Sequence, residues 1–326
     1  MLRIDSHLHF IGNHPDCVKT LEELDCKLLN ICGVWEQGMD WRANQAEPYR
    51  AQHKSNKKRF EWITTFDLPR FNDSNYVEAC IATLKQDFDD GACAVKIWKN
   101  IGMEIKKPGG EWFLPDDPLF IPILEFIENS GKTLLMHIAE PLACWRPLKE
   151  GTPHYGYFKA YPQWHMYNKP EYPSHEHLMQ CRDNIVARHP KLRCVGAHFG
   201  SLEYDVSEMA KRFDKYPNFA VDTSARLLDV MCQDSNKVRQ FFIDYQDRIM
   251  FGTDFVSTND KTAATPEEIR KANDQYRYDI KAWCSYLETT DTVTVWDKWQ
   301  ARGLGLPQSV LEKVYHKNAQ RWYPGV

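Results

Sequence analysis

The amino-acid sequence predicts a closed α/β barrel of the (β/α)8 (TIM) type, built as a single domain over residues 1–326. Short apolar segments alternate with longer amphipathic ones, which is the order expected of parallel strands joined by helices. A chain of 326 residues also suits one such barrel with insertions. No glycine-rich G-x-G-x-x-G segment follows the first strand, which disfavours an open dinucleotide-binding sheet.

Each predicted strand is a short apolar run bounded by polar or turn-forming residues. The expected strands are residues 2–10, 28–35, 60–66, 92–98, 132–138, 192–199, 218–223 and 248–254.

The stretches between the strands carry helical patterns with recognisable ends. We expect "SNYVEACIATLKQDFDDG" to begin at the N-cap Ser74 and to stop at Gly91, and "PLFIPILEFIENSG" also closes on a glycine. "SHEHLMQCRDNIVARHP" is expected to begin after the capping residue Ser174 and to end at Pro190.

The first strand, "RIDSHLHF", has two different faces. Because successive side chains of a strand alternate, Asp5, His7 and His9 should share one face. We expect the two histidines to face the barrel axis at its rim. The opposite face should pack outward on the helices and consists of Ile4, Leu8 and Phe10.

The composition limits the class of partner. With 41 basic and 45 acidic residues the formal net charge is −4, so no basic footprint indicates nucleic acid. The longest apolar runs, such as "LLMHIA", are too short to cross a membrane, and Arg3 and Asp5 interrupt any N-terminal apolar run. Ten scattered cysteines without a C-x-x-C pair fit reduced, buried thiols. We expect a cytoplasmic protein with a small-molecule substrate, with a homodimer as a further option.

Polar residues of one chemical kind end several predicted strands. His7 and His9 end the first strand, His137 the fifth, His198 the sixth and Asp254 the eighth. In a barrel, the carboxyl ends of the strands meet at one face, where catalytic groups gather. Any one of these residues alone would more often be a core histidine or a turn aspartate, but their joint placement favours a metal site.

The chemistry of this set suits a transition metal. Histidines at i and i+2 have Cβ atoms about 6.5–7 Å apart, so both rings can reach one ion. A third histidine, His137, and the carboxylate of Asp254 would complete a nitrogen-rich site for zinc, manganese, iron or cobalt. Such an ion lowers the pKa of a water molecule toward about 7. Asp254 could take the proton of this water, and His198 could polarise the water or the substrate or protonate the leaving group.

The motifs "DSHLHF", "LLMHIAEP", "VGAHFGS", "IMFGTDF" and "VYHKNAQRWY" occur in this order along nearly the whole chain. In these motifs the chain resembles the amidohydrolase superfamily, specifically its amidohydrolase-2 branch of hydrolases, lactonases, hydratases and decarboxylases. The resemblance implies that His7, His9, His137 and Asp254 bind the metal and that His198 assists the water or the substrate. It also implies one divalent transition metal, zinc first, and disfavours a second one.

Lys96, in "AVKIWKN", has two expected roles. In other branches of the superfamily a carboxylated lysine at the end of the fourth strand bridges two metals. The amidohydrolase-2 branch commonly has a similar lysine with a single metal, so Lys96 could instead bind an anionic substrate or pair with a carboxylate.

The segment 140–173, after the fifth strand, holds eight aromatic residues and six prolines. A connection of this length and composition is typical of a structured lid, and we expect it over the active site. An alternative is that its aromatic residues pack the loop itself or form a dimer contact. The candidate substrate contacts, inside this segment and elsewhere on the rim, are Trp98, Trp145, Arg146, Tyr155, Tyr157, Trp164, His165 and Arg226.

Taken together, the sequence predicts a metal-dependent hydrolase that directs activated water at a carbonyl centre. A lactone or cyclic ester of a small carboxylated or sugar-derived compound is the expected substrate. One alternative is a metal-dependent decarboxylase, a lyase, acting on an aromatic or muconate-like acid. A second alternative is a catalytically silent barrel that binds a ligand.

Overall fold

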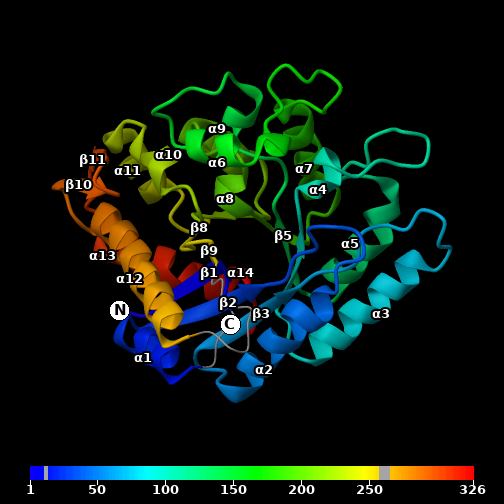
Figure 1. The fold of residues 1–326 in the computed structure, drawn as a ribbon, viewed down its shortest axis with the longest axis horizontal. Helices are drawn as coiled ribbons and strands as arrows, with labels where there is room; N and C mark the ends of the chain where they lie inside the picture. The colour runs from blue at the N-terminus through cyan, green and yellow to red at the C-terminus, as the bar shows by residue number, and fades with distance from the viewer. Residues whose placement is uncertain (11–13, 257–264) are drawn as a thin grey trace.

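The computed structural model describes residues 1–10, 14–256 and 265–326. Within them, parallel strands form one curled sheet surrounded by helices (Figure 1), which confirms the predicted (β/α)8 barrel. The strands are β1 (Arg3–His9), β2 (Cys26–Ile31), β3 (Phe60–Thr64), β4 (Ala94–Ile97), β5 (Thr133–Met136), β6 (Arg193–Gly196), β7 (Phe219–Asp222), β8 (Ile249–Met250) and β9 (Phe255–Val256).

The eighth barrel strand is interrupted, which corrects the expectation of one strand over 248–254. β8 pairs with β7, whereas β9 pairs with β1, so the two short pieces together close the barrel. Between them Asp254 has a left-handed backbone with φ of 61°, which a regular strand cannot contain. Backbone hydrogen bonds from Ser6 N–H to Phe251 O (3.0 Å) and from Asp254 N–H to His7 O (2.7 Å) span the interruption.

Helices cover the outside of the sheet and both of its ends. They are α1 (Pro15–Glu23), α2 (Glu47–Ser55), α3 (Tyr76–Asp89), α4 (Asn100–Met103), α5 (Ile121–Asn129), α6 (Tyr155–Ala160), α7 (His175–Arg188), α8 (Ala197–Gly200), α9 (Val206–Lys215), α10 (Leu227–Met231), α11 (Ser235–Asp244), α12 (Pro266–Glu288), α13 (Gln308–Glu312) and α14 (Asn318–Trp322). A hairpin of β10 (Thr292–Val295) and β11 (Trp299–Arg302) lies outside the barrel sheet. Of the described helices, none is long and apolar enough to cross a membrane.

Two of the predicted helix ends can be compared directly. The Ser174 side chain accepts the N–H of His177 at 3.1 Å and caps α7, as expected. The expected cap at Ser74 is wrong, because α3 begins at Tyr76 with Asn75 before it. The predicted end of α3 at Gly91 is confirmed, because Gly91 takes the left-handed backbone (φ 101°) that glycine adopts at little cost.

The simple alternation expected for β1 is broken by a bulge. Asp5 pairs with Leu28 and Leu8 with Asn30, so three steps along β1 match two along β2. An extra residue reverses which face the following side chains occupy. Ile4 therefore packs inside the barrel and Asp5 points outward, against the expectation for both, whereas Leu8 packs outward as expected. The bulge allows an outward Asp5 and an inward His7 on one short strand.

The apolar core has two parts. The larger part lies between the barrel and the helices and includes Leu8 and Phe10. The smaller part fills the barrel, where Trp322 and Tyr323 at the end of the chain pack against strand residues. Asn318 on α14 donates to the carbonyls of Gln246 and Ile249, each at 2.7 Å, and so ties this plug to the start of β8.

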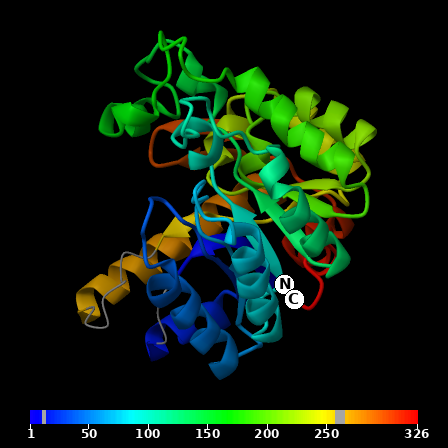
Figure 2. The ribbon, with the colours of Figure 1, turned by 90° about the vertical axis from the view of Figure 1, so that its right-hand side faces the viewer.

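The segment 140–173 is not one open loop. It contains short helices at Leu142–Trp145, Tyr155–Ala160 and Pro162–Trp164. Figure 2 shows this green segment at the upper end of the molecule.

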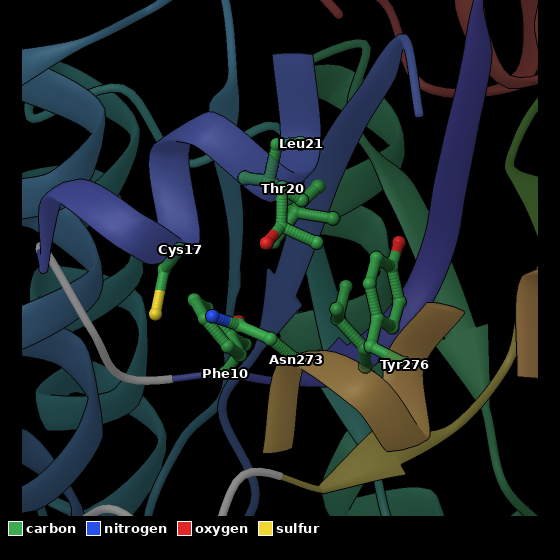
Figure 3. A pocket seen from close by; sticks show the side chains of 8 residues that line it. Phe10, Cys17, Thr20, Leu21, Asn273 and Tyr276 are labelled. Atoms are coloured by element: carbon green, nitrogen blue, oxygen red, sulfur yellow. The ribbon is translucent and has the colours of Figure 1, made fainter. Parts of the chain in front are cut away.

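A small pocket lies on the outer side of β1, between α1 and α12 (Figure 3). It lies on the opposite side of β1 from the inward-facing His7, and its walls are mainly apolar. Its lining residues are Leu8, Phe10, Cys17, Thr20, Leu21, Leu28, Asn273 and Tyr276.

Candidate metal centre and active site

The His7 side chain on β1 is fully buried and is fixed by a carboxylate behind it. Its Nδ1 lies 2.8 Å from Oδ2 of Asp222, the last residue of β7. Asp222 also accepts the backbone N–H groups of His198 (2.9 Å) and Ser224 (3.1 Å), and the Ser224 hydroxyl. Because an ionised carboxylate only accepts hydrogen bonds, Nδ1 of His7 carries the proton and Nε2 keeps its lone pair.

The free lone pair of His7 faces two further charged groups. Lys96 Nζ on β4 lies 2.9 Å from His7 Nε2. Oδ1 of Asp254 lies 3.5 Å from His7 Nε2 and 3.8 Å from Nε2 of His9. Burial lowers the pKa of Lys96 to about 8. The Lys96 amine thus lies among the donor atoms, a position compatible with both of its expected roles.

His137 and His198 complete the inner ring of imidazoles. Their ring centroids are 4.3 Å apart, and His198 is 4.6 Å from His7. Nδ1 of His198 contacts the Ser224 carbonyl (3.0 Å) and hydroxyl (2.8 Å), so Nε2 is the nitrogen left for a ligand. Nε2 of His137 is buried and has no hydrogen-bond partner among the described residues.

The tightest donor group differs from the expected set. His7, His198 and Asp254 each offer one atom within 4.8 Å of the others. His9 and His137 flank this group: His9 contacts Asp254, and His137 contacts His198. The structure therefore places three strand-end residues in one donor group that includes His198, and each of the other two contacts one member of that group.

Burial controls the protonation of these groups. It lowers the pKa of His9 to about 3 and those of His7, His137 and His198 well below the usual value. Neutral imidazole is the form that binds metal ions. Burial also raises the pKa of Asp254 to about 6, although the nearby Lys96 opposes this shift.

Left-handed backbone occurs after four successive strands. The non-glycine residues with positive φ that come first after these strands are Ala139 (66°), His198 (58°), Ala225 (53°) and Asp254 (61°). Each costs conformational energy that the surrounding structure must offset, and such residues concentrate at functional sites. Here they turn the chain sharply at the carboxyl ends of β5 to β8.

Tryptophans form a wall beside the imidazoles. Trp35, after β2, contacts His9 edge-to-face with centroids 5.5 Å apart, and Trp98, after β4, lies 6.3 Å from His137. Trp98 also contacts Trp35 (5.2 Å) and Trp164 of the segment 140–173 (5.5 Å). Of the candidate substrate contacts, Trp98 and Trp164 are therefore at the site.

A buried lysine lies behind this wall. Lys99 is ion-paired with the buried Glu140 and donates to the Tyr157 hydroxyl at 3.0 Å. Its ammonium lies over the ring of Trp164 (4.1 Å) and near that of Trp98 (5.2 Å). Through Tyr157 this group attaches α6 to the carboxyl ends of β4 and β5.

Arg226, after β7, is the second buried cation near the imidazoles. It is 7% exposed, and its charge helps lower the pKa of His7 and His198. It donates to the Ala225 carbonyl at 3.0 Å, and its Nε lies 4.0 Å from Oε2 of the buried Glu203.

The other candidate contacts have partners elsewhere on the rim. Trp145 donates to the Pro173 carbonyl at 3.0 Å and packs against His175, and Arg146 is exposed near Tyr204. The contact of Tyr155 is with Lys159, and His165 contacts the Arg146 carbonyl. The described contacts of these four do not connect them to the strand-end residues.

Several residues of the site were not predicted from the sequence. Asp222 ends a predicted strand in "VDTS" and could have been found by the same test as Asp254. Trp35 and Glu140 follow strands closely, but neither has a spacing that distinguishes it from packing residues.

Comparisons with known proteins agree with the fold. The family model described as amidohydrolase (Amidohydro_2) matches residues 4–325. A comparison with curated proteins gives no match.

Solved structures resemble the chain at low sequence identity. The 2,6-dihydroxybenzoate decarboxylase from Rhizobium has a TM-score of 0.58 at 14% identity, over 99% of this chain and 98% of that one. The 5-carboxyvanillate decarboxylase from Sphingomonas paucimobilis has a TM-score of 0.51 at 14% identity, over 96% and 83%. An amidohydrolase from Burkholderia multivorans has a TM-score of 0.51 at 12% identity, over 99% of each chain. These likenesses show the fold, and the family match over nearly the whole length shows that the chain belongs to the amidohydrolase family.

Proposed function

We propose that this protein is a metal-dependent hydrolase in which His7, His9, His137 and Asp254 hold one divalent transition metal, zinc first. The observation that carries the proposal is that imidazoles from two strand ends and the Asp254 carboxylate from a third lie close together. Two features support the fit. The Asp222 carboxylate fixes the His7 tautomer that binds metal, and the buried Nε2 of His137 has no hydrogen-bond partner among the described residues.

A metal bound there would lower the pKa of a water molecule and polarise a carbonyl oxygen. Asp254, which lies beside His7 and His9, is suited by its position to accept the proton of the attacking water and to return it to the leaving group. Nδ1 of His198 donates to the Ser224 carbonyl, so its neutral Nε2 accepts a hydrogen bond. We therefore assign His198 to orienting the water rather than to protonating the leaving group.

Arg226 supports a carboxylated substrate. Its guanidinium is buried, and Nε has no hydrogen-bond partner among the described residues. The planar donors of the Arg226 guanidinium suit a carboxylate, and its positive charge helps to lower the pKa of both His7 and Asp254. A small carboxylated lactone or cyclic ester would place its carbonyl at the imidazoles and its acid group at Arg226.

Decarboxylation is the second candidate, and the tryptophan wall favours it. Trp35 and Trp98 stand directly beside His9 and His137. Flat aromatic faces are suited to packing against a planar aromatic acid. In that reaction Asp254 would deliver a proton to the ring carbon from which CO₂ departs.

One experiment separates the two candidates. The zinc-loaded protein and its chelator-treated form are each incubated with sugar-derived lactones and with aromatic carboxylic acids. Metal-dependent acid release without CO₂ supports the hydrolase, and metal-dependent CO₂ release without ester cleavage replaces it with the decarboxylase.

The silent barrel is tested by metal content. His137→Ala should lower the bound metal, whereas His165→Gln, a histidine substitution on the rim, should not. A wild-type protein that retains no metal after reconstitution would contradict both enzymatic proposals.

A further inference from the structure

A second buried polar cluster lies on the rim, beyond β5, β6 and β7. It consists of His154, which precedes α6, Glu203, which follows α8, and Asp229 on α10. One imidazole nitrogen and one oxygen from each carboxylate lie within 4.8 Å of one another. The side chains are 13%, 2% and 10% exposed, so the cluster is well shielded from solvent. None of these residues belongs to the candidate metal centre described above.

The hydrogen bonds of the cluster leave one buried acceptor unused. Nε2 of His154 contacts Oδ1 of Asp229 at 2.8 Å, and the Leu142 N–H donates to Oε1 of Glu203 at 3.2 Å. Oε2 of Glu203 has no hydrogen-bond partner among the described residues, and Nε of Arg226 stays 4.0 Å away. A buried carboxylate oxygen without a donor is costly, and it is a common property of groups that bind a ligand or an ion.

The two carboxyl groups of the cluster also act on each other, and Arg226 and His154 oppose this effect. Burial and then the neighbouring charge of Asp229 raise the pKa of Glu203. A divalent cation would remove this repulsion and would give Oε2 of Glu203 a partner.

We propose that His154, Glu203 and Asp229 form a second site for a divalent cation such as Zn²⁺. One imidazole and two carboxylates are common zinc ligands, with bonds of about 2.0–2.2 Å. In a tetrahedral site these bonds place neighbouring donor atoms about 3.4 Å apart. The His154–Asp229 contact of 2.8 Å would need to open by only about half an ångström.

This ion would hold the segment 140–173 in place. His154 belongs to that segment, whereas Glu203 and Asp229 belong to the elements after β6 and β7. It would also fix Glu203 beside Arg226, the proposed substrate-binding cation. The second site thus joins the segment 140–173 to the wall of the active site without taking part in the reaction.

Metal stoichiometry tests the proposal on the full chain. After chelation and reloading with Zn²⁺, the wild-type protein should retain two equivalents, and His154→Gln and Asp229→Asn should each retain one. His137→Ala should also retain one, because it removes only the first centre. His165→Gln and Asp214→Asn are matched controls from the same segment and from an exposed position, and both should retain two.

The outcomes separate the two metal proposals. A wild-type protein with one equivalent, lost in His137→Ala and kept in His154→Gln, would overturn the second site and leave the proposed function standing. One equivalent lost in His154→Gln and kept in His137→Ala would do the reverse.

A second measurement does not depend on the folding of the cluster variants. Co²⁺ added to metal-free His137→Ala protein should give a visible absorption band that saturates at one equivalent. Occupancy should also slow tryptic cleavage after the exposed Lys149 and Lys159. Absence of both the band and the protection would refute the site.

Discussion

Replacing Asp222 by asparagine tests how the site selects the tautomer of His7. An asparagine can keep an oxygen at the Oδ1 position, where His198 and Ser224 donate. Its NH₂ group then replaces Oδ2 and faces Nδ1 of His7, which lies 2.8 Å from Oδ2 in the native protein. Two donors cannot face each other, so His7 should move its proton to Nε2, the nitrogen proposed to bind the metal.

The expected magnitude follows from the contact that is lost. A buried hydrogen bond to a charged group contributes about 1.5–3 kcal/mol. Loss of a carboxylate that orients a metal-binding histidine weakens metal affinity by about 10- to 100-fold. The second range corresponds to about 1.4–2.7 kcal/mol, so the two values agree.

The assay is a Zn²⁺ titration against a competing chelator, together with ¹⁵N–¹H NMR correlations that identify the imidazole tautomer. Asp87→Asn is the matched control. Asp87 is also buried, and it binds Arg42 and Thr64 on the outer side of the barrel. The Asp87→Asn protein should be less stable than the wild type but should bind Zn²⁺ with the same affinity. A folded Asp222→Asn protein with native metal affinity and an unchanged His7 tautomer would refute the reasoning.

Three further predictions concern stability. Burial lowers the pKa of His175 to about 4, so the unfolded chain binds more protons than the folded one between pH 4 and 6.5. The free energy of unfolding should therefore fall as the pH drops through this window, by up to about 3 kcal/mol from this group. His175→Gln should flatten the pH dependence of thermal melting. Gly196→Ala should cost about 1–3 kcal/mol in urea unfolding, because the added Cβ would lie 2.7 Å from the backbone of Gly200; an unchanged midpoint would contradict this. Lys99→Met should cost about 3–5 kcal/mol by leaving Glu140 buried without its cation, and the double variant with Glu140→Leu should recover most of that loss; equal stability of single and double variants would contradict it.

The pattern of the sequence was sufficient to predict the barrel and the polar residues at the carboxyl ends of its strands. Apolar runs alternating with amphipathic ones predict parallel strands, and parallel strands bring their carboxyl ends to one face. His7, His137 and Asp254 could therefore be grouped without a structure, although up to 247 positions separate them.

Other features depend on how the strands pair. The bulge in β1 reverses the faces of Ile4 and Asp5, and nothing in "RIDSHLHF" marks it, because a bulge arises from the register against β2. The interruption of the eighth strand is likewise visible only in the pairing, where β8 pairs with β7 and β9 with β1 on either side of the left-handed Asp254.

The sequence by itself determined the order of the strands and the metal-binding type of residue at their ends, because periodicity and residue chemistry are local properties. Only the tertiary structure decided that Asp222 supports His7, that Lys96 lies among the donor atoms, and that Oε2 of Glu203 has no hydrogen-bond partner among the described residues. These contacts join residues from different strands and loops. Their distances depend on barrel closure and register, which no local pattern contains.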